Sequence, residues 1–388
     1  MRRQRPVVKD GLYSLPMKTK NKTNRTPSVV STSTAPVTAG GFTLGLDLGD
    51  RSHYVCVLDA TGQILHEGPL LNERVALALL LTQYPAATVA LEAGTHSPWI
   101  SRHLTGLGAT VIVANPRKLH AISRHERKCD RRDAVMLARL ARADVALLHP
   151  LQHGTAQAQH DLLGLKLRDA LVRTRVGLIN TVRFTLKSLG YPVANPSSES
   201  FHKHIVSEVP ADCLPVVQPL LAVLALITTQ IKTLERDLVA RSKKAYPVTQ
   251  RLQQIAGVGP LTALCFVLKI GEPTRFGRSR DVGPYLGLCP GRDQSGGTDK
   301  QLRISKGGDG LLRRLLVSAA HYILGPFGPA CALRAYGQHL IGTSTREKKR
   351  AVVAVARKLA VLLLSLWKHG TDYEPRVPAP APLVLVAA

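Results

Sequence analysis

Short apolar runs separated by turn residues fill the stretch from Phe42 to Leu148, and this pattern constrains the fold more than any other feature. The runs read as strands at 42–49, 53–59, 63–70, 87–94 and 110–116, and as helices at 73–84, 98–108 and 132–148. Three early strands followed by alternating helices and strands predict an α/β or α+β domain with a mixed sheet over residues 41–149.

The strand pattern ends after Pro150, where a helical hairpin is expected over residues 150–245. Apolar side chains recur every seven residues, with two more at the complementary spacing: Leu165, Val172, Ile179, Leu186, then Val182 and Leu189. This spacing is typical of a long helix packed on another, and the second apolar helix follows at 219–245. The remaining face is expected to be basic, through Arg168, Arg173, Arg175, Arg183 and Lys187. Such a hairpin either spaces or dimerises domains, or also lies along nucleic acid.

A mainly helical C-terminal domain is expected over residues 246–373. A glycine-bracketed turn opens it, a Gly/Pro-rich middle follows, and helices are predicted at 311–324 and 349–367. Outside the domains, residues 1–40 read as a disordered basic arm and residues 374–388 as a Pro-rich tail.

The charge balance points to a polyanionic partner. The 388 residues include 52 Lys and Arg against 26 Asp and Glu, a formal net charge of +26, while 45% of the chain is hydrophobic and only 4% aromatic. A packed protein with this excess concentrates polyanions, and its low aromatic content favours contact with nucleic-acid backbones over base stacking.

The cysteines and the apolar runs indicate the cellular compartment of the protein. Six cysteines are scattered without a CxxC pair or zinc-like spacing, which indicates reduced thiols in a cytosolic protein and no structural zinc. The longest apolar run near the C-terminus is interrupted by Arg357 and Lys358, and no signal peptide is recognisable. The protein is therefore expected to be soluble and cytoplasmic, with no membrane partner.

Four acids stand where predicted strands end or a helix begins: Asp47, Glu92, Asp130 and Asp133. Asp130 and Asp133 are three residues apart and so share one helical face. An acidic cluster repels DNA unless a cation lies between them, and oxygen ligands suit Mg²⁺ or Mn²⁺ in a two-metal arrangement. The structural alternative is that Asp130 caps the helix, Asp133 pairs with a neighbouring arginine, and Asp47 completes a turn; Asp50 is a rival for Asp47.

These motifs carry a family resemblance. GLDLGDRSHYVCVL, ALEAGTHSPWI and NPRKLHAISRHERKCDRRDA, in this order, resemble the RuvC-like, RNase H-fold domain of DEDD transposases of the IS110 (IS-one-ten) insertion-sequence family, which is related to the Piv-type invertases. The segment from IAGVGP to LLRRLLVSAA resembles the family's C-terminal transposase domain. The resemblance covers Phe42 to Tyr373 and implies that Asp47, Glu92, Asp130 and Asp133 form the acidic tetrad.

The C-terminal half holds the second set of candidate residues. Gly257 and Gly259 of GVGP open a predicted helix in a helix-hairpin-helix-like pattern, where backbone N–H groups can approach a phosphate. Ser295, in the polar segment SGGTDK, reads from chemistry as a turn residue, but the resemblance assigns it as the catalytic serine. Ser305 is a weaker alternative. Basic side chains near Ser295 that could stabilise phosphate charge are Arg303, Lys306, Arg313 and Arg314.

The resemblance implies a mechanism and partners. It implies a transposase or serine recombinase that cuts and rejoins double-stranded DNA at element ends and target through a covalent phosphoserine. It also implies a bridge RNA guide and a bacterial or archaeal cytosol near the nucleoid. The helical seam of the hairpin is consistent with a homodimer or tetramer. The main alternative is a RuvC-like metal-dependent nuclease or junction resolvase acting by hydrolysis. A sugar-kinase-like ATPase lacks a second phosphate loop here, and a non-catalytic binding protein has no need of the acids and the serine.

Overall fold

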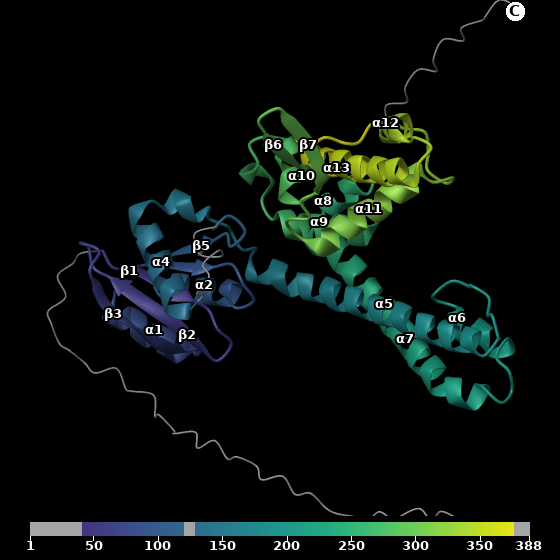
Figure 1. The fold of residues 1–388 in the computed structure, drawn as a ribbon, viewed down its shortest axis with the longest axis horizontal. Coiled ribbons are helices and arrows are strands. Elements are labelled where there is room, and N and C mark those ends of the chain that lie inside the picture. The colour runs from purple at the N-terminus through teal and green to yellow at the C-terminus, as the bar shows by residue number, and fades with distance from the viewer. Residues whose placement is uncertain (1–40, 120–128, 376–388) are drawn as a thin grey trace, which may run out of the picture. The chain divides into compact units, whose positions relative to one another are not determined.

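The computed structural model describes residues 41–119 and 129–375, so the predicted arm at 1–40 and nearly all of the predicted tail at 374–388 lie outside it. The chain divides into two compact units between Gln152 and His153 (Figure 1). Each unit is described by itself.

The first unit is built on a five-stranded sheet. Its strands are β1 (Thr43–Asp47), β2 (Ser52–Leu58), β3 (Ile64–Leu71), β4 (Thr88–Glu92) and β5 (Thr110–Ala114), in the spatial order β3-β2-β1-β4-β5. β2 runs antiparallel to both β1 and β3, whereas β4 is parallel to β1 and β5 is parallel to β4. The carboxyl ends of β1, β3, β4 and β5 therefore share one edge. The predicted mixed sheet is confirmed, and the arrangement is compatible with an RNase H-like fold.

Helices cover both faces of this sheet. α1 (Arg74–Gln83) and α2 (Ser97–Gly106) bury one face, where Leu46 and Leu91 pack with Leu77 and Ile100. α4 (Asp130–Ala143) covers the other face. This layering follows from the strand pleat, because successive residues point to opposite faces and both faces here carry apolar side chains.

The single helix predicted at 132–148 is wrong in its second part. α4 ends at Ala143 because Asp144 adopts an extended backbone (φ −163°, ψ 116°). The Asp144 carboxylate then accepts a hydrogen bond from the Ala146 N–H at 2.8 Å and caps the short 3₁₀ helix η1 (Val145–Leu148). Asp is favoured at such caps, which explains why periodicity alone misplaced the end.

The second unit begins with an antiparallel helical hairpin. α5 (Ala156–Ser188) packs along α7 (Leu214–Ala245), with α6 (Phe201–His204) and η2 (Ile205–Ser207) in the connection. Leu165 and Leu238 share one core cluster, while Leu186 and Leu221 share another at the opposite end. Of the predicted seam, Leu165, Ile179, Val182 and Leu186 are buried and Val172 is half-buried. Leu189 follows the last helical turn and is 59% exposed.

The predicted basic face of α5 is only partly correct. Arg168 forms an ion pair with Glu235 of α7, and Arg173 pairs with Asp169 at 3.1 Å. Arg175 is buried, and its Nε and Nη1 atoms have no hydrogen-bond partner within the described part of the chain. Pairing and burial therefore remove part of the charge that the sequence placed at the surface.

The rest of the second unit is mainly helical, with one β-hairpin that was not predicted. Its helices are α8 (Val248–Leu252), α9 (Pro260–Ile270), η3 (Pro273–Arg275), η4 (Ser279–Asp281), α10 (Val282–Tyr285), α11 (Gly310–Leu324), α12 (Ala332–Leu340) and α13 (Thr345–His369). β6 (Pro290–Ser295) and β7 (Thr298–Ile304) form the hairpin. Phe266, Leu316 and Leu359 lie in the core between α9, α11 and α13.

One helix among the described residues, α7, is long and apolar enough to cross a membrane by length and composition. A single helix of this kind is weak evidence for a span. α7 packs on α5 along the hairpin and carries the ion pair from Glu235 to Arg168.

Candidate functional site

Asp47 and Glu92 end neighbouring parallel strands. β1 and β4 pair in parallel with Leu46 opposite Leu91, so the next residue on each strand is an acid. Leu46 and Leu91 pack on the α1/α2 side, and the strand pleat therefore turns Asp47 and Glu92 to the α4 side. Both side chains are half-buried. The strand register therefore brings the positions of these two acids to one edge of the sheet.

α4 begins at the same edge. Gly45 of β1 lies so close to α4 that a Cβ there would approach the Ala134 oxygen to 2.0 Å. At the other end of α4, Arg142 donates to the Ala60 oxygen at 2.7 Å, in the turn between β2 and β3 at the amino edge of β1. The first turn of α4, with Asp130 and Asp133, therefore lies toward the carboxyl edge of β1 and β4. The ends of β1 and β4 and the first turn of α4 therefore lie toward one side of the unit.

The two acids of α4 differ in environment. Asp133 is buried, whereas Asp130 is exposed. The alternative that Asp130 caps the helix is wrong, because Cys129 occupies the N-cap position and makes no side-chain capping bond. Arg131 forms an ion pair with Glu67 of β3. Asp47, Glu92 and Asp133 each have an interaction partner in the structure.

The donor chemistry of the four acids fits a hard divalent cation, because carboxylate oxygens are the ligands that Mg²⁺ and Mn²⁺ prefer. In the described ranges, however, no group of three or more His, Cys, Asp or Glu side chains is arranged to hold a metal ion. The backbone thus gathers the acids at one edge, while the side chains are not assembled as a closed ligand set.

Polar contacts tie the loops of this edge together. The Gly49 N–H donates to Nδ1 of His53 at 3.3 Å, and the Asn72 amide donates to the Gly49 and Asp50 oxygens at 3.3 and 3.0 Å. His96, which follows β4, lies 2.9 Å from the Asp50 carboxylate. These contacts join the chain segments that follow β1, β3 and β4. Asp50 therefore has a loop-bridging position and is not the equivalent of Asp47.

Burial shifts two titrations beside the acids. It lowers the pKa of His53, and the nearby His96 lowers it further, so His53 holds the Gly49 loop as a neutral ring. Burial raises the pKa of Tyr54, which lies opposite Asp47 on β2, and the neighbouring Glu67 raises it too. Tyr54 is therefore a neutral phenol next to the acidic edge at physiological pH.

We predict that Gly45→Ala destabilises the first unit and separates α4 from β1. The added methyl group would meet backbone atoms of Ala134 and Ala138, which cannot rotate away, so the cost should be about 3 kcal/mol or more. Gly94→Ala is the matched control, because its Cβ would have no atom within 4 Å. Urea unfolding of both variants measures the difference. Equal stabilities would contradict the close approach of α4 to β1.

Ser295 lies in the other unit, at the tip of the β6–β7 hairpin. It is the last residue of β6 and pairs with Thr298, with Gly296 and Gly297 forming the two-residue turn. Gly296 has a positive φ of 55°, which such turns require and glycine adopts readily. Ser295 therefore stands directly beside a tight hairpin turn. Its side chain is exposed on an ordered hairpin.

Hydrogen bonds and close backbone contacts hold the base of the β6–β7 hairpin. The Lys306 N–H donates to the Gly287 oxygen at 3.1 Å, and a Cβ on Gly287 would approach the Gly307 nitrogen to 2.2 Å. Arg313 donates to the Leu286 and Gly307 oxygens at 3.0 and 2.6 Å. Asp309 caps α11 and pairs with Lys269 at 2.6 Å, a partner that helps to lower the pKa of Asp309 against the effect of burial.

The basic residues around Ser295 have separate roles in this geometry. Arg313 braces the hairpin base, and Arg314 pairs with Asp169 of α5 at 2.7 Å. Arg303 lies near the base of the hairpin, where the pairing register shifts, and the nearby Gln301 receives a hydrogen bond from Arg350 of α13. Lys300 was not assigned a role from the sequence. It lies opposite Asp293 in the strand register and shares the face of Ser295. Only strand register could have identified it. Lys306 is exposed next to the hairpin base.

The GVGP segment opens α9 as predicted. Gly257 has a φ of 85° and lies against α11, where a Cβ would approach the Ala319 oxygen to 2.9 Å. Gly259 is the N-cap of α9 and has no side chain that could cap the helix. An open pocket of about 400 Å³ lies here, lined by uncharged groups that include Thr262, Ser318 and Tyr322.

Comparison with known families decides the identity of the chain. A family model described as a transposase, the DEDD type named after IS110, matches residues 44–190 and thus both the acidic edge and α5. A second, described as the transposase IS116/IS110/IS902 family, matches residues 249–332, which contain GVGP and the Ser295 hairpin. The chain is a transposase that resembles the IS110/IS116 family of DEDD transposases in both units. It is therefore an enzyme that cleaves DNA and transfers its strands.

Curated relatives of this transposase align over nearly their whole length. The transposase for insertion sequence element IS1111A of Coxiella burnetii is 28% identical over 85% of this chain and 91% of its own. The transposase for insertion sequence element IS1328 of Yersinia enterocolitica is 28% identical over 85% and 98%. A probable family 20 transposase of Pseudomonas aeruginosa is 27% identical over 86% and 98%.

Proposed function

We propose that this transposase recombines DNA through two chemical centres, an acidic metal site in the first unit and a serine nucleophile in the second. The proposal is supported by the backbone placement of two segments toward one edge of the sheet, the strand ends with Asp47 and Glu92 and the first turn of α4 with Asp130 and Asp133. The protein that carries these acids has a net charge of +26. Four acids at one place in so basic a chain are costly beside DNA unless cations lie between them.

The acids would hold Mg²⁺ or Mn²⁺ when DNA is bound. Asp47 and Glu92 stand on rigid neighbouring strands, and buried Asp133 is fixed by the packing of α4 on Gly45. Exposed Asp130, one turn from Asp133, is free to approach the DNA side. The cation supplies Lewis-acid stabilisation of the charge that develops on phosphate oxygens. The residues orient it, and Tyr54 remains a neutral neighbour.

Ser295 would act as the nucleophile. Its hydroxyl oxygen bonds to phosphorus as the bond from phosphorus to one bridging oxygen breaks, the hydroxyl proton leaves to a base, and the departing oxygen gains a proton. The resulting phosphoserine keeps the phosphodiester energy, so attack by another strand end rejoins DNA without ATP. The exposed hairpin tip suits this role, and Lys300 on the same face is the nearest cation by register to stabilise the phosphate.

Target choice would come from a structured bridge RNA encoded beside the gene. The excess of basic residues suits backbone contacts to DNA and RNA, and the open pocket at the start of α9 suits a phosphate approached by the N–H groups of its first turn. A dimer or tetramer would supply two or more sets of catalytic residues for paired element ends.

A second candidate, a hydrolytic nuclease or junction resolvase, is favoured by one observation. All four acids belong to the first unit and Ser295 to the second, so the acidic edge is a complete group without the serine. In that case water would replace the Ser295 hydroxyl as nucleophile, and free ends would replace the covalent product.

We predict that chelation of divalent cations abolishes cleavage of element-end DNA while leaving DNA binding intact. Adding back Mg²⁺ or Mn²⁺ should restore cleavage, and Ca²⁺ should support binding with at most weak cleavage, because catalysis demands tighter octahedral geometry. A cleavage gel and a mobility-shift gel on the same samples measure both. Undiminished cleavage in chelator would contradict the metal site.

A further inference from the structure

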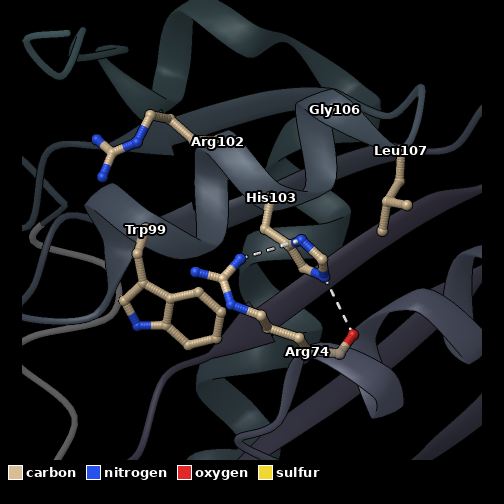
Figure 2. Close-up of a pocket in the computed structure, with 6 residues that line it drawn as sticks. All are labelled: Arg74, Trp99, Arg102, His103, Gly106 and Leu107. Atoms are coloured by element: carbon tan, nitrogen blue, oxygen red, sulfur yellow. Dashed lines mark hydrogen bonds between the residues drawn. The ribbon is translucent and has the colours of Figure 1, made fainter. Parts of the chain in front are cut away.

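An arginine-lined pocket lies between the start of α1 and the outer side of α2, apart from the residues assigned above. It is open, has a volume of about 360 Å³, and is lined by Arg74, Trp99, Arg102, His103, Gly106 and Leu107. Figure 2 shows the Arg74 guanidinium between the Trp99 and His103 rings. None of the six lining residues is acidic, so the pocket is cationic with one large aromatic side.

Within the described part of the chain, Arg74 is held by Trp99 and His103 and not by a carboxylate. Its guanidinium lies 5.2 Å from the centre of the Trp99 ring, and its Nη1 donates to Nδ1 of His103 at 3.5 Å. Nε2 of His103 donates in turn to the Arg74 backbone oxygen at 3.0 Å, which fixes the tautomer (Figure 2). The Arg74 guanidinium is therefore pre-oriented, and its positive charge is available to an incoming anion.

The position of Arg74 in its helix is unfavourable for stability. It is the first residue of α1, where the helix dipole disfavours a positive charge, and the neighbouring acid Glu73 is an exposed N-cap residue that makes no side-chain capping bond. Among the described residues Arg74 forms no ion pair, and a local preference broken in this way points to function at that place. An anion in the pocket would supply the missing compensation.

The pocket adjoins the acidic edge. α1 and α2 both begin just after strands whose carboxyl ends form that edge, β3 and β4. The Trp99 indole N–H donates to Nδ1 of His96 at 3.3 Å, and Nε2 of His96 lies 2.9 Å from Asp50 in the loop after β1. A continuous chain of contacts thus runs from the loops beside Asp47 and Glu92 to the pocket.

We infer that this pocket binds one nucleotide of a single strand that passes the acidic edge, with its phosphate on Arg74 and Arg102 and its base against Trp99. Arginine binds phosphate through its planar fork, and an aromatic ring stacks on any base without reading sequence. A duplex keeps its bases stacked and cannot offer one to Trp99. The inference rests on the proposed function, because it presumes that the acidic edge acts on nucleic acid.

The test measures binding of the full-length protein to labelled single-stranded DNA and RNA of one sequence, and to duplex DNA, between about 50 and 200 mM salt. We expect Arg74→Ala and Trp99→Ala each to weaken single-strand binding roughly tenfold, with Trp99→Phe retaining most of the affinity. Arg74→Ala should also reduce the salt slope by about 0.7, the share of one phosphate contact, and Trp99→Ala should leave it unchanged. Arg139→Ala, an exposed arginine on α4, is the control and should stay close to wild type.

The binding measurements on DNA, on RNA and on the variants distinguish the possible outcomes. A loss confined to RNA or to DNA supports the inference and identifies the strand. The inference is overturned if Arg74→Ala and Trp99→Ala bind like Arg139→Ala, or if an abasic strand binds wild type as well as the normal strand. Melting temperatures near wild type confirm that the variants are folded. Failure of the wild type to bind or cut any nucleic acid would instead contradict the proposed function.

Discussion

Replacing Asp47 with Asn is expected to lower the rate of metal-dependent DNA cleavage roughly a thousandfold or more, because it removes an anionic ligand that orients the cation at the scissile phosphate. DNA affinity should stay equal or rise, since one negative charge is lost beside a polyanion. Asn has nearly the shape of Asp, and Asp47 is only half-buried at a strand end, so the fold should persist. Single-turnover cleavage and a mobility-shift titration measure the two effects.

Asp59→Asn is the matched control for this loss. Asp59 follows β2 at the opposite edge of the sheet, where its carboxylate accepts hydrogen bonds from Thr61 and Gln63. An Asn side-chain oxygen can accept the same bonds, so this variant should cleave like wild type. Comparable cleavage by Asp47→Asn and Asp59→Asn would remove Asp47 from the catalytic site.

Ser295→Ala is expected to abolish the covalent protein–DNA product and strand rejoining, with a loss of at least about ten-thousandfold, as for other enzymes that lose their nucleophile. The side chain is exposed at the hairpin tip, so stability should hardly change. A protease-sensitive adduct on a denaturing gel is the readout. Thr298→Ala tests position, because Thr298 pairs directly with Ser295 across the hairpin.

The Thr298→Ala variant should still form the adduct, because it keeps the Ser295 hydroxyl. Ser305→Ala should do so as well, because the Ser305 N–H bonds to the Cys289 oxygen at the base of the hairpin, away from the tip. An adduct that survives Ser295→Ala and disappears with Ser305→Ala would move the nucleophile to the alternative serine.

The sequence predicted the first unit well because its signals are local. Strand and helix periods differ, and β1 to β5 carry strongly apolar runs, so the mixed sheet and its flanking helices follow from pattern alone. Two features were not predicted. One is the end of α4, which depends on a single residue, and the other is the β6–β7 hairpin, whose strands carry polar side chains on both faces. Asp144 ends α4 by taking an extended backbone, and β6 and β7 are polar on both faces, so no apolar alternation marks them as strands.

The candidate site was predictable in part for a related reason. Parallel pairing of β1 and β4 is enough to bring Asp47 and Glu92 to one edge of the sheet. The close approach of α4 depends on Gly45, whose role appears only when the Ala134 backbone is seen beside it. Likewise, Lys300 shares a face with Ser295 through the register of a hairpin that the sequence did not reveal. The Arg74–Trp99 stack joins segments far apart in the chain.

The most direct test of the two-centre account is to identify the atom that carries DNA. Wild-type protein is incubated with element-end DNA, the adjoining RNA and Mg²⁺, the adduct is digested with protease and nuclease, and the nucleotide-bearing peptide is sequenced by mass spectrometry. The account predicts a nucleotide phosphate on Ser295, in an adduct that Asp47→Asn no longer forms. Free cut ends without any adduct, or a nucleotide on another residue, would contradict it.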